Sequence, residues 1–187
     1  MVLAQSAAVA AVEAIESKTS VQNVDVKKVQ AILKNNPLAD GSTPEIVIDN
    51  NEKEHIQVQG EWLTQQYTGY GPSIFYSEEN TGKKKWVKFI PAINKTGYYN
   101  VYSYFLPGYK NAASKTLLTI YNGGEEKQIV IKKSDIKVEG QTSGEWIPLG
   151  RFYLKKGSGN FVKISNKDAD GTVVADAVLF KPENPNP

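Results

Sequence analysis

The tyrosines of one nine-residue run, Gly97–Phe105 (GYYNVYSYF), are the residues whose spacing most clearly suggests chemistry. Alternate side chains of a strand point to opposite faces, so Tyr98, Tyr102 and Tyr104 would share one face. A row of amphipathic rings can stack against hexoses and offer them hydroxyl groups for hydrogen bonds. The run therefore suggests a platform for sugars. The alternative is structural, because aromatic residues are good strand formers and could simply cover the second face of a sheet beneath loops.

Further aromatic residues in or beside predicted loops extend this candidate surface, namely Trp62, Tyr70 and Tyr109. Gly69 and Gly71 flank Tyr70 and would let the loop pass close to a ligand or a partner backbone. The same glycines would equally allow a tight turn that packs Tyr70 inward. Both interpretations of this loop stay open at the level of the sequence.

The segment Asn166–Gly171 (NKDADG) copies the first half of an EF-hand loop, which has oxygen-bearing side chains at positions 1, 3 and 5 and glycine at position 6. Position 12 is Ala177, where the EF-hand needs a bidentate glutamate, and no helices are predicted beside the segment. A β-hairpin turn is therefore the favoured interpretation, and no metal site is predicted. Calcium held in another geometry is an open alternative, with ligands drawn from Asp49, Asp168, Asp170 and Asp176.

No pattern of residues predicts catalysis or a resident cofactor. The 187 residues include one histidine, His55, and no cysteine, which excludes thiolate chemistry, disulfides and multi-histidine zinc sites. The sequence contains no phosphate loop, no GxGxxG and no GxSxG. Several acidic residues could act as an acid–base pair, but no spacing selects one pair among Glu61, Glu139, Glu145 and Asp176.

Charge and composition argue against nucleic acid or a membrane as the partner. The net charge of +2 provides no strong field, and the one lysine run, Lys83–Lys85, is predicted to lie in a solvated turn. No run approaches the roughly 20 apolar residues of a membrane helix. Hydrophobic residues make up 40% of the chain, which is ordinary for a folded domain and excludes global disorder.

Two short helices are predicted near the N-terminus. Residues 4–17 are rich in alanine, and their smooth surface suits close packing against another backbone. Asp25 is placed to cap a second helix, whose apolar residues recur at three- and four-residue spacing as far as Leu33. Residues 40–44 (DGSTP) read as a linker.

From Glu45 onward the sequence predicts strands separated by turns, which is typical of an all-β antiparallel β-sandwich of jelly-roll type. In the run 97–105 the inward face is predicted to be Tyr99, Val101, Ser103 and Phe105, and Trp86 and Trp146 are also predicted to be core. The last three strands are predicted to form an antiparallel meander. The predicted strands are 45–49, 56–59, 62–67, 73–76, 85–90, 97–105, 116–122, 127–132, 146–154, 160–165 and 172–180.

Seven segments together carry a resemblance to a known family: IVIDN (46–50), GEW (60–62), GYGPS (69–73), WVKFIP (86–91), GYYNVYSYF (97–105), GEWIPLGRFYL (144–154) and ADAVLF (175–180). Through them, residues 45–181 resemble the golvesin and xanthan-lyase C-terminal-like domain, a β-sandwich carried by secreted bacterial enzymes. The resemblance implies a non-catalytic accessory module, often described as carbohydrate-binding-like, in a secreted, periplasmic or cell-surface protein. It supplies no fixed set of sugar-binding residues.

Residues 4–35 carry a second resemblance, through AQSAAVAA (4–11) and VQNVDVKKVQAIL (21–33). They are similar to the last segment of FAD-dependent oxidoreductases, in which a GQ-x-A-G-x-AA helix sits near the flavin. Ala4 and Ala8 stand where that family tends to have glycine, and the sequence lacks the dinucleotide-binding βαβ unit. The resemblance implies that FAD belongs to a longer parent protein, and that this chain alone binds no cofactor.

The predicted organisation is a helical remnant of an upstream oxidoreductase domain with its linker (1–44), a β-sandwich module (45–182) and a frayed tail (183–187). The first functional hypothesis is a module that binds a polysaccharide or glycoconjugate. The second is a structural or dimerisation domain of the parent enzyme that binds no sugar. Exposure of Tyr98, Tyr102 and Tyr104 would favour the first hypothesis, and their burial would favour the second.

Overall fold

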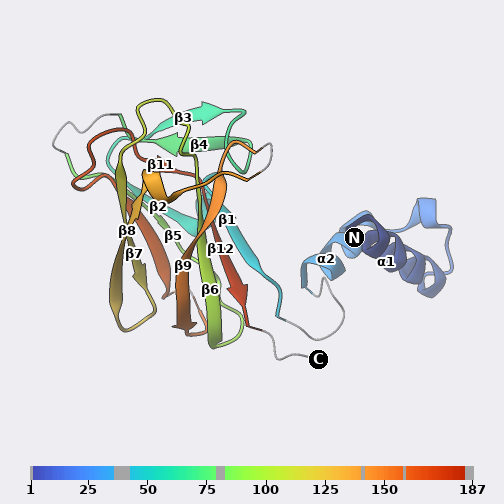
Figure 1. Cartoon of the computed structure of the whole chain (residues 1–187). Coiled ribbons are helices and arrows are strands. Elements are labelled where there is room, and N and C mark those ends of the chain that lie inside the picture. The colour runs from blue at the N-terminus through green and yellow to red at the C-terminus, as the bar shows by residue number, and fades with distance from the viewer. Residues whose placement is uncertain (1, 36–42, 79–82, 140–141, 158, 184–187) are drawn as a thin grey trace. The chain divides into compact units, whose positions relative to one another are not determined.

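The computed structural model describes residues 2–35, 43–78, 83–139, 142–157 and 159–183. These residues belong to two compact units, a helical one within residues 1–44 and a β unit over residues 45–183 (Figure 1). Residues 40–42 of the predicted linker and all of the predicted tail except Glu183 lie outside the described residues.

The helical unit contains α1 (Val2–Glu16), the short 3-10 segment η1 (Val21–Asn23) and α2 (Val26–Asn35). Asp25 caps α2 as predicted, because its Oδ1 accepts hydrogen bonds from the backbone N–H groups of Lys27 and Lys28, at 2.9 and 3.4 Å. The buried carboxylate of Glu13 on α1 accepts hydrogen bonds from Lys28 Nζ and Ser17 Oγ. The bond from Lys28 lowers the pKa of Glu13 and joins the two helices.

The β unit contains two main antiparallel sheets and a small third sheet at one end (Figure 1). The four-stranded sheet has the order β1 (Ile46–Asp49), β12 (Ala177–Pro182), β6 (Gly97–Phe105) and β9 (Glu145–Leu154). The five-stranded sheet has the order β2 (Ile56–Gln59), β5 (Trp86–Phe89), β10 (Phe161–Ser165), β7 (Lys115–Tyr121) and β8 (Glu126–Lys132). The third sheet consists of β11 (Val174–Ala175), β4 (Ser73–Tyr76) and β3 (Leu63–Gln66), and two 3-10 segments, η2 (Lys53–His55) and η3 (Lys133–Asp135), lie in connections. The predicted all-β sandwich of jelly-roll type is confirmed.

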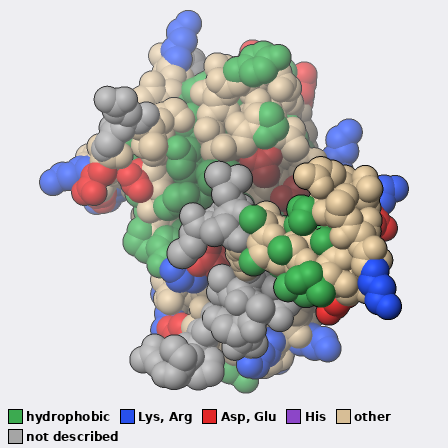
Figure 2. Space-filling view, turned by 90° about the vertical axis from the view of Figure 1, so that its right-hand side faces the viewer, with side chains coloured by type: hydrophobic (Ala, Val, Ile, Leu, Met, Phe, Trp, Pro, Cys, Tyr) green, Lys and Arg blue, Asp and Glu red, His purple; other side chains and the backbone are tan. Residues whose placement is uncertain are grey.

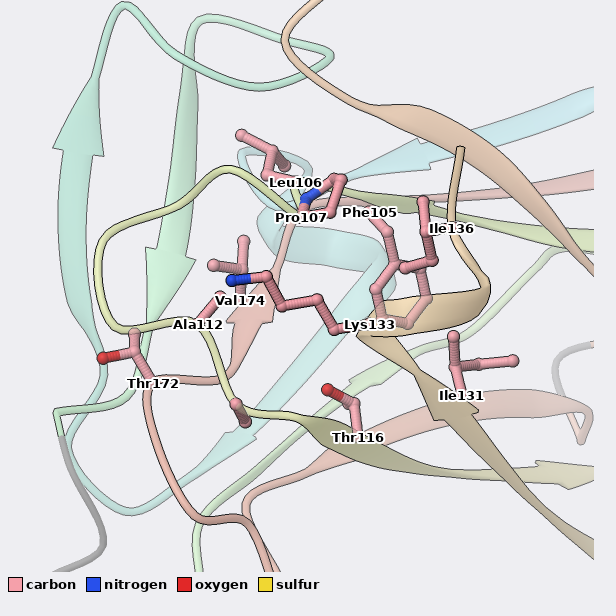
Figure 3. Close-up of a pocket in the computed structure, with 11 residues that line it drawn as sticks. Phe105, Leu106, Pro107, Ala112, Thr116, Ile131, Lys133, Ile136, Thr172 and Val174 are labelled. Carbon is pink, nitrogen blue, oxygen red and sulfur yellow. The ribbon is translucent and has the colours of Figure 1, made fainter. Parts of the chain in front are cut away.

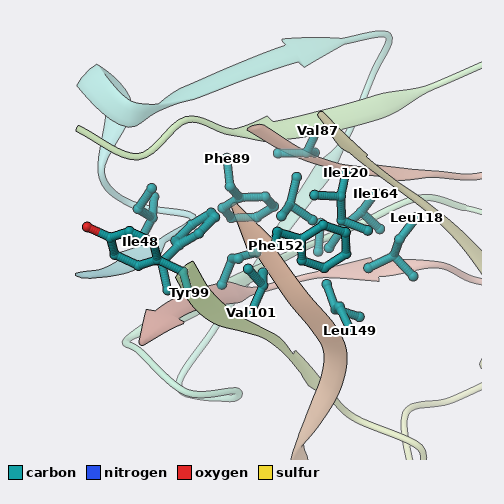
Figure 4. Close-up of a cluster of buried hydrophobic side chains, with 14 of the residues drawn as sticks. Ile48, Val87, Phe89, Tyr99, Val101, Leu118, Ile120, Leu149, Phe152 and Ile164 are labelled. Atoms are coloured by element: carbon teal, nitrogen blue, oxygen red, sulfur yellow. The ribbon is translucent and has the colours of Figure 1, made fainter. Parts of the chain in front are cut away.

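The main core lies between the two large sheets and is built from alternate residues of their strands (Figure 4). On β6, Tyr99, Val101 and Ser103 are buried as predicted, and Phe105 is half-buried against the core. The hydroxyl of Tyr99 donates a hydrogen bond to the carbonyl oxygen of Lys95 at 2.8 Å, so the ring is buried while its polar end keeps a partner. The five-stranded sheet contributes Val87, Phe89, Leu118, Ile120, Val162 and Ile164.

The expected meander of the last three strands is wrong. Strand β9 pairs with β6, β10 pairs with β5 and β7, and β12 pairs with β1 and β6. The chain therefore passes from the four-stranded sheet at β9 to the five-stranded sheet at β10 and back to the four-stranded sheet at β12, as in a jelly roll. Apolar alternation indicates which face of a strand is buried, but it does not choose the strand's hydrogen-bonding partner.

The last predicted strand, 172–180, is divided at Asp176. Before this residue, β11 pairs with β4 in the small sheet, and after it β12 pairs with β1 in the four-stranded sheet. Asp176 is completely buried at the point where the chain passes from one sheet to the other. A buried carboxylate therefore sits at the junction of two sheets.

Candidate functional site

The three tyrosines on the outward face of β6 differ strongly in exposure. Tyr98 is 43% exposed, Tyr102 is half-buried and Tyr104 is only 8% exposed. The exposed row therefore does not continue along the whole strand. A sugar on this face can reach Tyr98 and part of Tyr102, but Tyr104 is covered.

Tyr153, which residue spacing did not reveal, lies directly opposite Tyr98 on the neighbouring strand β9 and is 48% exposed. The two ring centroids are 5.1 Å apart with an angle of 71° between the ring planes, an edge-to-face contact. The pairing of β6 with β9 shifts between Val101 and Tyr102, where Leu149 is an extra residue on β9 and is buried. Tyr98, Tyr102 and Tyr153 together form what we call the tyrosine face.

Arg151 places a positive charge at the tyrosine face. Its guanidinium carbon lies 3.4 Å from the ring centroid of Tyr98, a cation–π contact. Its Nε and Nη2 groups donate hydrogen bonds to the two carboxylate oxygens of Glu183, at 2.7 and 2.9 Å. These bonds lower the pKa of Glu183 and raise that of Arg151. A bidentate pair of this kind fixes the guanidinium plane and leaves its other N–H groups as donors.

Tyr104 is covered because two aromatic side chains pack around it. Its ring centroid is 5.8 Å from that of Tyr70 and 5.3 Å from that of Trp146, and the last two are 5.0 Å apart. Tyr70 belongs to the loop between β3 and β4 and is 48% exposed, whereas Trp146 is half-buried. We call these three residues the aromatic cluster. Tyr104 belongs to a second apolar cluster apart from the main core, and Trp146 packs against that cluster.

Tyr109 and Trp62, the remaining predicted site residues, are both half-buried. The Tyr109 hydroxyl donates a hydrogen bond to Gln65 Oε1 at 2.7 Å, and burial raises the pKa of Tyr109. Trp62 packs against the main core, and its indole N–H donates to the carbonyl oxygen of Gln59 at 3.2 Å. Both side chains have protein partners in these positions.

A second set of outward aromatic side chains lies on the five-stranded sheet. Trp86, which was expected in the core, is only half-buried, because its neighbour Val87 takes the inward position. The ammonium nitrogen of Lys88 lies 5.0 Å from the ring centroid of Trp86 and 4.3 Å from that of Phe161. Phe161 also stacks on Tyr121 at 5.2 Å. These rings are largely covered by one another and by lysine.

A pocket opens beside the end of β6 (Figure 3). Its polar lining consists of Thr116, Lys133 and Thr172, and the rest of its wall is apolar. The apolar lining residues are Phe105, Leu106, Pro107, Ala112, Ala113, Ile131, Ile136 and Val174. Few of these groups could hydrogen-bond the many hydroxyls of a sugar.

The turn at Asn166–Asp170 uses its side-chain oxygens to hold the backbone. Lys85 N donates to Asn166 Oδ1, and Ser114 N donates to Asp170 Oδ1, both at 2.7 Å. The segment joins β10 to β11, which belong to different sheets, so the predicted hairpin is wrong. In the described ranges, no three histidine, cysteine, aspartate or glutamate side chains come together as metal ligands.

The described surface mixes charges of both signs. Figure 2 shows basic and acidic side chains interspersed over one face of the molecule. None of the described helices is long and apolar enough to cross a membrane.

Comparisons with known proteins agree with the fold. A xanthan lyase from Paenibacillus is similar in structure, with a TM-score of 0.64 and 25% sequence identity over 75% of this chain and 13% of that enzyme. The CBM35 of Cellvibrio japonicus Abf62 (TM-score 0.50, 14% identity, 76% of this chain and all 100% of that one) shares the fold. So does the Podospora anserina GH26-CBM35 β-(1,4)-mannanase (TM-score 0.50, 15% identity, 76% of this chain and 28% of that one). No curated protein sequence matches the chain.

The family comparison covers most of the β unit. Residues 46–182 match the Golvesin C-terminal domain family, which confirms the first resemblance found in the sequence. The match begins after the helical unit, so the resemblance of residues 4–35 to FAD-dependent oxidoreductases stays a prediction. By the extent of the match, the chain belongs to the Golvesin C-terminal domain family.

Proposed function

We propose that the β unit is a non-catalytic module that binds a polysaccharide or glycoconjugate through the tyrosine face. The observation that carries this proposal is the pair of exposed rings, Tyr98 and Tyr153, directly opposite each other on β6 and β9. Family membership supports it, as does the fold shared with carbohydrate-binding modules.

The tyrosine face combines the two kinds of contact that sugars need. Ring surfaces of Tyr98 and Tyr153 can stack on the C–H groups of a pyranose, and their hydroxyls can exchange hydrogen bonds with it. The guanidinium of Arg151 lies over one face of the Tyr98 ring, 3.4 Å from its centroid, so a sugar would stack on the ring surface left exposed, with the Arg151 N–H groups beside it. Because Glu183 already orients this guanidinium, binding a sugar hydroxyl or carboxylate there costs little additional ordering.

A structural or dimerisation role is the second candidate, and the burial of Tyr104 favours it. This residue packs beneath Tyr70 and Trp146 and contributes to an apolar cluster rather than to a binding surface. Half-burial of Tyr102 points the same way, because it shortens the exposed row. In this alternative the tyrosine face contacts protein, either another copy of the chain or a domain of the parent.

A glycan array probed with the purified chain separates these two candidates. Wild type is compared with the double variant Tyr98→Ala/Tyr153→Ala and with Tyr67→Ala, which removes a loop tyrosine that is 97% exposed. Carbohydrate binding predicts glycan signals that the double variant loses and Tyr67→Ala retains. No signal from wild type on any glycan, together with a dimer that the double variant abolishes in size-exclusion chromatography, would establish the structural role instead.

We also propose that the parent protein carries an FAD-dependent oxidoreductase domain before this module and acts outside the cytoplasm. The similarity of residues 4–35 to the end of such enzymes supports the oxidoreductase domain, and so do exposed apolar side chains on the helical unit, namely Val12, Ile15 and Val26. On this proposal the purified chain is colourless, and the longer protein shows flavin absorbance. A longer protein without flavin would contradict the proposal.

A further inference from the structure

Three buried oxygen atoms near the junction of β1 and β12 receive no hydrogen bond from any described residue: Asp49 Oδ2, Asn50 Oδ1 and Asp176 Oδ1. Asp176 and Asn50 are 0% and 1% exposed. The backbone N–H of Asn50 donates to the carbonyl oxygen of Asp176 at 2.9 Å, and Asp49 pairs with Ala177, so all three belong to one corner of the fold. Burying a hydrogen-bond acceptor without a partner costs free energy. Three unpaired acceptors in one corner therefore indicate that a single partner binds all of them.

A chain of hydrogen bonds fixes the orientation of these side chains. The carboxylate oxygen Asp49 Oδ1 accepts from the backbone and side-chain N–H groups of Asn51, at 3.0 and 2.7 Å. Asn51 Oδ1 then accepts from the hydroxyl of Ser73, and Ser73 Oγ accepts from Asn50 Nδ2, each at 3.0 Å. A hydroxyl donates only one hydrogen, so the order of donors is set from the carboxylate outward. Asn50 therefore turns its carbonyl oxygen, and not its NH₂ group, toward the unpaired position.

The loop Gly69–Gly71 closes over the same two carboxylates. The backbone N–H of Tyr70 donates to Asp176 Oδ2 at 2.8 Å, which leaves Oδ1 as the unpaired atom. A Cβ on Gly71 would lie 2.2 Å from Asp49 Oδ2, and one on Gly69 would lie 2.5 Å from Asp176 Oδ2, so only glycine fits at either position. The backbone of the loop is thus packed directly on both acidic side chains.

The negative charges of the two carboxylates are not balanced by a basic side chain in the described ranges. No lysine or arginine in the described ranges forms an ion pair with Asp49 or Asp176. Burial, and then the nearby charge of Asp49, raises the pKa of Asp176 to about 7. One proton shared between the carboxylates would donate a single hydrogen bond, which leaves at least one of the three acceptors unpaired. A cation bound by all three oxygens would give each of them a partner and would balance both charges.

We propose that Asp49 Oδ2, Asn50 Oδ1 and Asp176 Oδ1 bind one divalent cation, and that this cation is calcium. All three ligands are hard oxygen donors, and two carboxylates match a charge of +2. Calcium accepts a flexible set of side-chain and backbone oxygens, whereas magnesium demands near-ideal octahedral geometry and keeps several waters. The ion ties the end of β1 to Asp176, between β11 and β12. Because the other carboxylate oxygen of Asp176 accepts the backbone N–H of Tyr70, the ion also orients the group that holds this loop.

Calcium-dependent thermal unfolding of the full chain tests this site. After treatment with EDTA and dialysis, unfolding is followed without added salt, with calcium chloride near 10 mM, with magnesium chloride at the same concentration, and with sodium chloride at matched ionic strength. Extracellular calcium modules bind with Kd values of about 0.1–1 mM, so the expected rise in Tm is roughly 3–10 °C. The bound calcium per chain, measured by calorimetry, is expected to be one.

Two variants locate the ion. Asp176→Asn removes one of the two negative charges that bind the ion, and Asp168→Asn removes an exposed carboxylate from the EF-hand-like turn as the matched control. The proposal predicts that Asp176→Asn abolishes the calcium-dependent rise in Tm and that Asp168→Asn retains it. If Asp176→Asn does not fold, Asp49→Asn serves the same purpose, and the wild-type stoichiometry is measured in any case. No calcium binding by wild type, equal shifts with sodium chloride, or loss of binding only in Asp168→Asn would each overturn the proposal.

Discussion

At the scale of single residues, the neighbouring side chains of a tyrosine decide whether its ring is buried or is exposed for contact with a ligand. Tyr98 and Tyr104 stand on the same face of the same strand, yet one ring is exposed and the other is buried. Tyr104 meets Trp146 and a loop that carries Tyr70, whereas Tyr98 meets Tyr153 and a guanidinium fixed by Glu183. Residue type and alternation alone therefore did not separate a packing residue from a candidate ligand contact.

Gly71 is a glycine at which substitution should be costly, because its Cα packs directly on a carboxylate. In Gly71→Ala the new Cβ would lie 2.2 Å from Asp49 Oδ2, so either the loop or the carboxylate must move. We expect a loss in the free energy of unfolding on the order of 2–4 kcal/mol. Urea denaturation measures it against Gly97→Ala, where a Cβ meets no atom within 4 Å. Equal effects of the two substitutions would contradict the close packing of the loop.

Asp176 should make stability depend on pH when no divalent cation is present. Its pKa is raised from an ordinary value of 3.8 to about 7, so between these values the folded state holds a proton that the unfolded state has lost. The stabilisation is complete below about pH 4 and falls as pH rises to 7, by up to about 1.4 kcal/mol per pH unit. Urea unfolding in EDTA across this range measures the slope. Asp176→Asn should flatten it and Asp168→Asn should not; an unchanged slope in Asp176→Asn would assign the effect to other groups.

At the scale of elements, the strands and their inward faces could be predicted from the sequence. In Gly97–Phe105, period-2 alternation identified Tyr99, Val101 and Ser103 as buried, because side-chain direction in a strand depends only on position along the chain. Asp25 as the cap of α2 was equally predictable, since capping is a contact between neighbours in sequence.

The partners of the strands could not be predicted, and most of the candidate site depends on them. Tyr153 faces Tyr98 only because β9 pairs with β6 and carries an extra residue at Leu149. The division of the last strand at Asp176 has the same origin, since β4 and β1 each take one half of it. Such contacts join residues that are far apart in the chain, so local residue patterns do not predict them.

The cap of α2 permits a matched test of helix stability. Asp25→Ala removes the acceptor for the backbone N–H groups of Lys27 and Lys28, and we expect a cost of about 1 kcal/mol to the helical unit. Ser20→Ala is the control, because Ser20 precedes η1 without a side-chain capping bond. Hydrogen exchange of the α2 amides should accelerate roughly fivefold in the first variant only. Equal acceleration in both variants would show that the cap contributes nothing specific.

At the scale of the whole molecule, family and fold narrow the function without naming a ligand. The chain belongs to the Golvesin C-terminal domain family and corresponds to 13% of the structurally similar xanthan lyase. Its β unit presents the tyrosine face on the four-stranded sheet, while the corner at Asp49 and Asp176 holds a loop of the small sheet. On the two proposals, the tyrosine face recognises the sugar and the corner at Asp49 and Asp176 fixes the loop.

The affinity of the purified chain for its strongest array glycan, measured by calorimetry, tests the central claim most directly. Stacking contributes about 0.5–1.5 kcal/mol per ring. Tyr98→Ala/Tyr153→Ala, still folded by circular dichroism, should therefore bind roughly tenfold more weakly or worse, with Tyr67→Ala unchanged. An unchanged Kd in the double variant would show that the sugar binds elsewhere, and absence of measurable binding by wild type would contradict the carbohydrate-binding function itself.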